Sequence, residues 1–223
     1  MKSDKRSTVY LIPSFLDPEA TDSLPYYIID AVKDCQLFFV ENERSARRFL
    51  KKIWKEMTID DYGWHTLNKE NDSDPIVLDN FRKAMREAKN IGIISEAGCP
   101  GIADPGQVLV ALAQAENARV KPLVGPSSIL LALMASGMNG QQFHFCGYLP
   151  IDKDKRIKAI RELEKDAEKN NCTQVFIETP YRNNAMLAAL LQHCHPNTRL
   201  CIAAGLTGAN ESIRTQTISE WKK

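Results

Sequence analysis

Two segments rich in glycine and proline each follow an apolar run and precede a helical pattern. The first reads IISEAGCPGIADPG (residues 93–106), and the second reads PLVGPSSILLALMASG (residues 122–137). Glycine lets the backbone approach a ligand closely and adopt positive φ, while proline stiffens a loop. Free backbone N–H groups at the start of a helix also favour an anionic group such as a carboxylate. Both segments are therefore candidates for a ligand site.

Helix capping is the simpler interpretation of the polar residues in these segments. Asp104 followed by Pro105 has the residue types of an N-cap and a first-turn proline, and Ser127 or Ser128 can cap the next helix. The length of segment 93–106, however, exceeds what a strand-to-helix connection needs.

A third segment, VFIETPYR (residues 175–182), also places polar residues after an apolar run. Glu178 has the type of a first-turn helix charge, and Arg182 that of a surface side chain. Ligands of open α/β sheets bind beyond the carboxyl ends of the strands, where all three segments would lie. The sequence contains neither GxGxxG nor GxxxxGK[ST], so an ordinary dinucleotide or P-loop site loses its main support.

Short apolar runs that alternate with helical patterns would position these segments. Strands are expected at residues 9–13, 36–40, 63–67, 91–95, 119–124, 143–148, 174–178, 199–203 and 213–218. Helices are expected at residues 24–33, 44–57, 74–89, 107–117, 127–136, 155–169 and 183–194. This alternation is typical of βαβ units and a largely parallel sheet.

Nine strands exceed what one compact sheet of this length usually carries. The last two strand candidates have no long helix between them, which predicts an antiparallel pair. We therefore expect two α/β domains, residues 1–123 with a mostly parallel sheet and residues 124–223 with a mixed sheet.

Composition and cysteine usage limit the class of protein. The chain has 223 residues, with 29 basic and 28 acidic side chains, which excludes a polybasic nucleic-acid coat and an acidic disordered tail. Its six cysteines form no CxxC and most of them lie in apolar runs, which predicts buried free thiols in a reducing compartment. We expect neither a signal peptide nor a membrane span, and hence a cytoplasmic location. Adjacent His193, Cys194 and His195 would point in different directions on a helix, so we expect no metal.

The expected helix at residues 44–57 has two faces. Apolar side chains recur on one side, and on the other lie Arg44, Arg47, Arg48, Lys51, Lys52 and Lys55. The basic face is either a solvated surface or a stripe that contacts RNA phosphates, with Arg44, Arg48, Lys51 and Lys52 as the candidate contacts.

The motifs SEAGCPGIADPG, VGPSS, GYLP and ETPYR, in this order and spacing, resemble the tetrapyrrole-methylase superfamily of S-adenosylmethionine-dependent methyltransferases. They are most similar to the branch that methylates the ribose 2′-hydroxyl of a cytidine in small-subunit ribosomal RNA. The likeness runs from residue 9 to the C-terminus, and residues 91–150 are its most specific part.

This resemblance implies two α/β domains with an S-adenosylmethionine cleft between them, a homodimer and an RNA substrate, with no DNA and no membrane partner. By resemblance, the loops at residues 95–106 and 125–128 surround the methionine part and the ribose, while residues 177–180 and 203–207 lie near the adenine. The cofactor-binding residues carried over are Ser95, Ala97, Gly98, Ile102, Ala103, Ser127, Ser128, Glu178 and Leu206.

Transfer to a hydroxyl also requires a proton acceptor. Glu41 is the candidate, because it matches the retained acid of the family's EDTR motif, here ENER (residues 41–44). The chain departs from the family at the first loop, PSFLDPEA, which lacks a glycine, and at AAGLTG, where the family has ARELTK. A methyltransferase for a tetrapyrrole-like small molecule, or a cofactor-binding RNA-interaction protein without turnover, therefore stands as an alternative.

Overall fold

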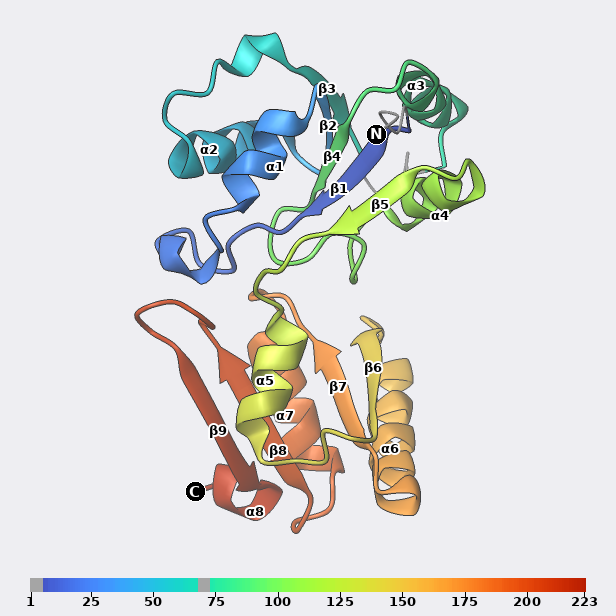
Figure 1. The fold of residues 1–223 in the computed structure, drawn as a ribbon. Helices are drawn as coiled ribbons and strands as arrows, with labels where there is room; N and C mark the ends of the chain where they lie inside the picture. Colours follow the sequence, from blue (N-terminus) through green and yellow to red (C-terminus); the bar gives the residue numbers. More distant parts are fainter. Residues whose placement is uncertain (1–5, 68–72) are drawn as a thin grey trace. The chain divides into compact units, whose positions relative to one another are not determined.

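The computed structural model describes residues 6–67 and 73–223 and divides the chain into two compact units, Met1–Ser127 (unit 1) and Ser128–Lys223 (unit 2). Figure 1 labels the elements of both units. Within the described part of the chain, no helix has the length and apolar character needed to cross a bilayer.

Unit 1 is built on one parallel sheet. Its strands are β1 (Thr8–Ile12), β2 (Leu37–Val40), β3 (Gly63–Thr66), β4 (Ile91–Ile94) and β5 (Arg119–Pro122). Its helices are η1 (Thr21–Ser23), α1 (Ile28–Asp34), α2 (Glu43–Ile53), η2 (Ile59–Asp61), α3 (Pro75–Arg86) and α4 (Gln107–Ala115). The strand order is β3-β2-β4-β1-β5, and every pairing is parallel, as expected from the sequence.

Helices cover both faces of this sheet, so side chains of one strand enter two cores. Phe38 packs with residues of α1 and α2, while its neighbour Phe39 packs with residues of α3 and α4. Figure 1 shows the two helix pairs on opposite faces. All four residues of β4 are buried, which confirms that IGII is a strand apolar on both faces.

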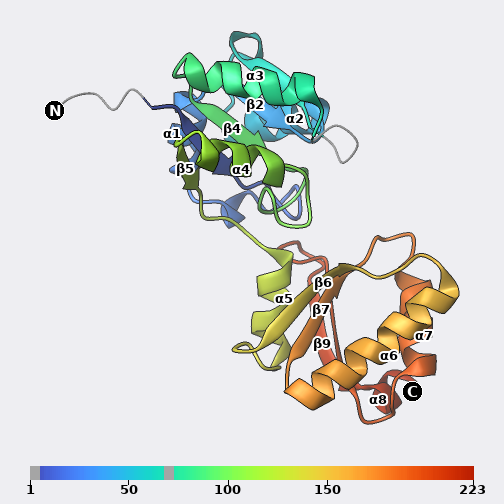
Figure 2. The same cartoon turned by 90° about the vertical axis from the view of Figure 1, so that its right-hand side faces the viewer.

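Unit 2 contains one parallel and one antiparallel strand pair. Its strands are β6 (Phe143–Tyr148), β7 (Thr173–Ile177), β8 (Arg199–Ala204) and β9 (Ser212–Thr217). Its helices are α5 (Ser128–Ser136), α6 (Lys153–Asn170), α7 (Asn183–His193) and α8 (Ile218–Trp221). β6 and β7 run parallel and β8 and β9 antiparallel, which confirms the predicted antiparallel pair. Figure 2 shows α5 on one face of these strands and α6 and α7 on the other.

Three local expectations needed correction. The first helix begins at Ile28 instead of residue 24, since the residue before Pro25 is disfavoured in a helix. The sequence analysis missed α8, although Thr217 and Glu220 form the capping box that announces it. Of the six free cysteines only Cys35 is buried, and the other five are half-buried.

Candidate functional site

Loops after β1 and β4 are bonded to each other at the carboxyl edge of the unit 1 sheet. The backbone N–H of Ser14 donates to the carbonyl of Gly98 at 2.9 Å, and that of Gly98 donates back to Ser14 at 3.3 Å. The buried Ser14 hydroxyl also donates to the carbonyl of Ser95 at 2.9 Å. Because β1 and β4 are neighbours in the sheet, these bonds fix the start of the 95–106 loop against the first strand.

The loop after β5 packs against the same place. Gly98 has a φ of +74°, and a Cβ there would lie 3.3 Å from Cδ2 of Leu16 and 3.4 Å from the carbonyl oxygen of Pro126. A Cβ on Gly125 would lie 2.2 Å from Cβ of Pro13. Glycine is therefore required at both positions, where three strand-end loops converge.

Beyond Gly98 the loop turns repeatedly through left-handed backbone. Gly101, Ala103 and Gly106 have φ values of +77°, +66° and +118°. Gly106, and not Asp104, is the N-cap of α4, so the expected Asp104–Pro105 capping pair is wrong. The chain must reverse through a left-handed residue immediately before the helix, and a Cβ on Gly106 would crowd Ile93 at 3.3 Å.

The predicted residues of this loop have unequal exposure. Ser95 and Gly98 are buried, Ala103 is half-buried, and Ala97 and Ile102 are exposed, Ile102 at 52%. Ile102 is thus an apolar side chain that lies open beside a stiff, glycine-rich backbone. Burial raises the pKa of the nearby Cys99 thiol, so this thiol stays neutral and is a poor nucleophile at neutral pH.

Two carboxylates follow the neighbouring strands β2 and β4. Oε2 of Glu41 accepts from the backbone N–H of Glu96 at 3.3 Å, and Oε1 of Glu96 accepts from the Ser45 hydroxyl at 2.9 Å. Asn42 caps α2 by accepting from the backbone N–H of Ser45 at 3.1 Å. Glu41 is therefore held at the same sheet edge as the 95–106 loop, with its Oε1 free of any bond to the described residues.

Helix α2 has the predicted apolar face, with Phe49 and Leu50 buried. The basic side chains on its other face differ in whether they bond within the protein. Lys51 donates to the backbone carbonyls of Lys55 and Met57, and Lys52 bonds Glu19 at 2.9 Å.

Arg44 and Arg48 lie one helical turn apart on that face and are exposed. Neither contacts a partner among the residues that the structure describes. Arg47, by contrast, pairs with Glu43 and lies 5.1 Å from the ring centroid of Trp64. Two of the four predicted RNA-contact residues are therefore available, and the two lysines are bonded within the protein.

In unit 2, Glu178 follows β7 and is not a solvent-exposed helix charge. Its side chain is 8% exposed, and its Oε1 accepts from Nε and Nη2 of Arg182 at 2.7 and 2.6 Å. Oε2 of Glu178 is buried and finds no hydrogen-bond partner in the described chain. A buried carboxylate oxygen without a donor is costly, which points to a donor supplied by a ligand.

The loop after β8, within the residues 203–207 that the resemblance places near the adenine, has a comparable feature that residue types did not reveal. Thr207 adopts a φ of +69°, which is strained for a β-branched residue, and its hydroxyl is buried without a partner within the described part. The predicted Leu206 beside it is buried. Ser128, the remaining predicted residue of unit 2, is half-buried at the first position of α5.

The structure thus brings Ser95, Gly98 and Pro126 together in unit 1, with Ser127 following Pro126 directly. Ser14 is the residue there that sequence reasoning missed, and its one signal is a small polar residue after Pro13, which follows β1. In residues 6–67 and 73–223, no group of three or more histidine, cysteine or acidic side chains could hold a metal ion.

Comparison with known proteins identifies a family. The model for Tetrapyrrole (Corrin/Porphyrin) Methylases matches residues 18–222. The chain is 27% identical to ribosomal RNA small subunit methyltransferase I of Halalkalibacterium halodurans, over 97% of this chain and 70% of that protein. It is 29% identical to the Bacillus subtilis protein of the same name, over 98% of this chain and 70% of that one. The crystal structure of the methyltransferase CobJ matches with a TM-score of 0.60 and 18% identity, covering 96% of this chain and 87% of CobJ.

Proposed function

The chain belongs to the tetrapyrrole methylase family, and on that premise we propose that it is an S-adenosylmethionine-dependent methyltransferase that acts on a ribose 2′-hydroxyl of small-subunit ribosomal RNA. The observation that carries the proposal is the family match over residues 18–222 together with the strand-end loops that converge at Gly98. The names of the two curated relatives favour RNA over a tetrapyrrole as the acceptor. The likeness to CobJ supports the fold alone.

The residues of unit 1 fit the methionine and ribose parts of S-adenosylmethionine. Gly98 lets the loops after β1 and β5 pack closely against the 95–106 loop, and Ile102 and Ala97 offer exposed apolar contact beside it. Ser95, Ala103 and Ser127 complete the set that we assign to the cofactor here. When bound, S-adenosylmethionine supplies a methyl group activated by its sulfonium, and these residues orient it.

The residues of unit 2 fit the adenine. Oε2 of Glu178 can accept from an exocyclic amino group, and the Thr207 hydroxyl can donate to or accept from a ring edge. Leu206 supplies apolar contact, and we assign Ser128 to the same cofactor. Arg182 fixes the orientation of Glu178 through two bonds to the other oxygen.

Glu41 is our candidate for the acceptor of the 2′-hydroxyl proton. Replacing it with glutamine keeps the oxygen that accepts from the Glu96 N–H but removes the basic group. We expect kcat to fall by about 10²–10⁴-fold, because general-base catalysis contributes roughly that much. Single-turnover transfer of labelled methyl to RNA measures this effect.

The control for Glu41→Gln is Glu56→Gln, which makes the same charge change at an exposed site beyond the end of α2. Cofactor affinity should be unchanged in both variants. If Glu41→Gln turns over within twofold of the wild type, Glu41 is not the base.

Arg44 and Arg48 are the RNA-phosphate contacts that we favour, because both are exposed and neither bonds another described residue. Removing both with Arg44→Gln and Arg48→Gln should lower the slope of log affinity against log salt by about 1.4, which is two contacts at roughly 0.7 each for a single strand. Glutamine keeps the helix propensity of α2. Salt titrations of RNA binding measure the slope.

The matched control is Lys51→Gln with Lys52→Gln, which removes the same charge from lysines already bonded within the protein. It should leave the slope near the wild-type value while lowering stability. Equal slope changes in both double variants would show that net charge alone, and not the two arginines, attracts RNA.

We also propose a homodimer and a cytoplasmic location. Leu130 and Met134 on α5 are 51% and 79% exposed, and a helix with apolar residues on all sides is usually covered. The family resemblance favours a second copy of the chain as the partner that covers this face of α5.

A further inference from the structure

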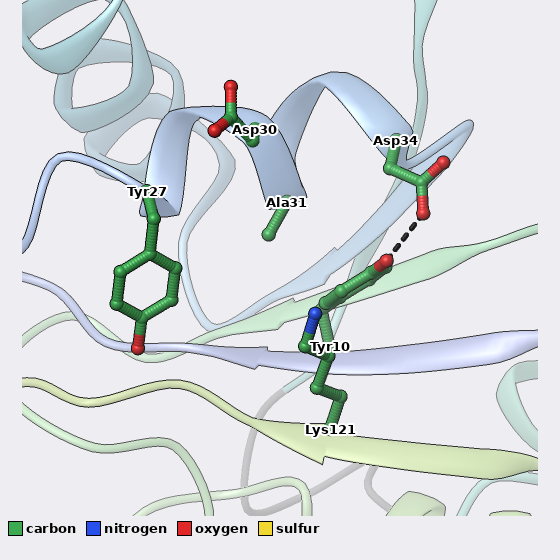
Figure 3. Close-up of a pocket in the computed structure, with 6 residues that line it drawn as sticks. All are labelled: Tyr10, Tyr27, Asp30, Ala31, Asp34 and Lys121. Atoms are coloured by element: carbon green, nitrogen blue, oxygen red, sulfur yellow. Dashed lines mark hydrogen bonds between the residues drawn. The ribbon is translucent and has the colours of Figure 1, made fainter.

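A cavity of about 380 Å³ lies in unit 1. Figure 3 shows it between α1 and the neighbouring strands β1 and β5. Its lining residues are Tyr10, Tyr27, Asp30, Ala31, Asp34 and Lys121. The small side chain of Ala31 leaves the space between the two tyrosines open.

One wall of this cavity is fixed by hydrogen bonds. Tyr10 is buried, and its hydroxyl donates to Oδ2 of Asp34, which also accepts from Nδ2 of Asn90 at 2.9 Å. Burial and the Asp34 carboxylate raise the pKa of Tyr10, so the phenol stays neutral. Nζ of Lys121 lies 5.4 Å from the centroid of the Tyr10 ring. The aromatic wall and its cation are therefore pre-organised.

Several polar groups of the lining are left for a ligand. Oδ1 of Asp34 and the carboxylate of Asp30 accept no bond from the described residues. The Tyr27 hydroxyl accepts from the backbone N–H of Val124 at 2.8 Å, so its own proton remains available. The cavity thus presents carboxylate acceptors from α1, a cationic donor from β5 and two aromatic rings.

We propose that this cavity binds a guanine base. Guanine presents two adjacent donors, N1–H and the N2 amino group, which suit carboxylates, and its O6 and N7 acceptors suit a lysine. Its ring can stack on the exposed ring of Tyr27, as bases do in single-stranded nucleic-acid sites. Adenine, cytosine and uracil lack this pair of donors beside an acceptor.

The cavity is connected to the strand-end loops through Tyr27. Val124, which Tyr27 holds, directly precedes Gly125 and Pro126, and the carbonyl of Pro126 packs at Gly98. Binding of guanine in the cavity would therefore affect the position of the loop after β5, which we assign to the cofactor. The guanine belongs either to a nucleotide of the RNA substrate or to a free guanine nucleotide. The first of these sources rests on the proposed function.

Calorimetry on the full chain with GMP, IMP, AMP, CMP and UMP tests the proposal. GMP and IMP differ only in the N2 amino group, so we expect IMP to bind about tenfold more weakly, because a lost base-edge contact costs roughly that much. Asp30→Asn and Lys121→Met should each weaken GMP binding by about tenfold, since each removes one proposed contact. Asp60→Asn, the same change at an exposed residue of η2, should have no effect.

Asp30 is exposed, so Asp30→Asn is compatible with folding. Ala31→Leu places a larger side chain in the cavity and should abolish GMP binding. Equal affinity for all five nucleotides, or GMP binding that neither Asp30→Asn nor Ala31→Leu weakens, overturns the guanine site.

A second arm separates the two sources of guanine. If a single-stranded RNA binds more weakly when inosine replaces its guanines, and Ala31→Leu removes that difference, the RNA source is supported. GMP binding without such a difference supports a free nucleotide and overturns the RNA source. Cofactor binding measured in parallel separates these outcomes from failure of the proposed function, because it does not involve Asp30 or Lys121.

Discussion

Valine in place of Gly98 is expected to abolish S-adenosylmethionine binding, with a loss of affinity of more than about 100-fold, or roughly 2.7 kcal/mol. The backbone at this position has a φ of +74°, which a β-branched side chain resists. The new Cβ would also meet Leu16 and the carbonyl of Pro126 at 3.3 and 3.4 Å, so the valine would push apart the loops that we assign to the cofactor. Calorimetry measures the affinity, and thermal denaturation measures the accompanying loss of stability.

Gly137→Val provides the matched control for backbone strain. Gly137 has a φ of +66°, but a Cβ there would meet nothing within 4 Å, and it lies just after α5, outside the assigned cofactor residues. Both variants should lose stability through backbone strain, and only Gly98→Val should lose the cofactor. Affinity within threefold of the wild type in Gly98→Val would contradict our placement of the cofactor.

Alanine in place of Gly125 is expected to destabilise unit 1 by about 3 kcal/mol, at the upper end of ordinary overpacking effects. A Cβ there would lie 2.2 and 2.3 Å from Cβ and Cγ of Pro13, and a proline ring cannot rotate away. Urea denaturation followed by tryptophan fluorescence measures the effect, because Trp54 and Trp64 report on unit 1.

Gly140→Ala is the control for the glycine-to-alanine change, since its Cβ would meet nothing within 4 Å and its φ lies outside the left-handed region. Gly140→Ala should leave the free energy of unfolding close to the wild-type value. A loss below about 0.5 kcal/mol in Gly125→Ala would mean that the loops after β1 and β5 yield easily, contrary to the convergence described above.

The strands and helices were predictable because their signals are local. The apolar run IGII is fully buried as β4, and the two-faced pattern after residue 43 became α2 with Phe49 and Leu50 in the core. The capping expectation for Asp104 failed because a left-handed turn at Gly106 was needed before α4, which residue types alone do not reveal.

The rest of the site depends on contacts between residues far apart in the chain. Ser14 meets Gly98, and Tyr27 meets Val124, through bonds that no local pattern encodes. The basic face of α2 could likewise be predicted, but the bond of Lys52 to Glu19 depends on where the loop after β1 folds. Sequence reasoning therefore singled out loops that the structure places at strand ends, while the two arginines without partners, the unpaired oxygen of Glu178 and the cavity beside Tyr10 required the structure.

Transfer of a labelled methyl group from S-adenosylmethionine to small ribosomal subunits tests the central claim most directly. The subunits should come from cells that lack this protein, so that the acceptor is unmethylated. We predict one methyl per subunit in the ribosomal RNA, located in a dinucleotide that resists alkali because its 2′-oxygen is blocked, and no transfer by Gly98→Val. Binding of S-adenosylmethionine without any label in the RNA, or label in an alkali-sensitive position, would contradict the proposed reaction.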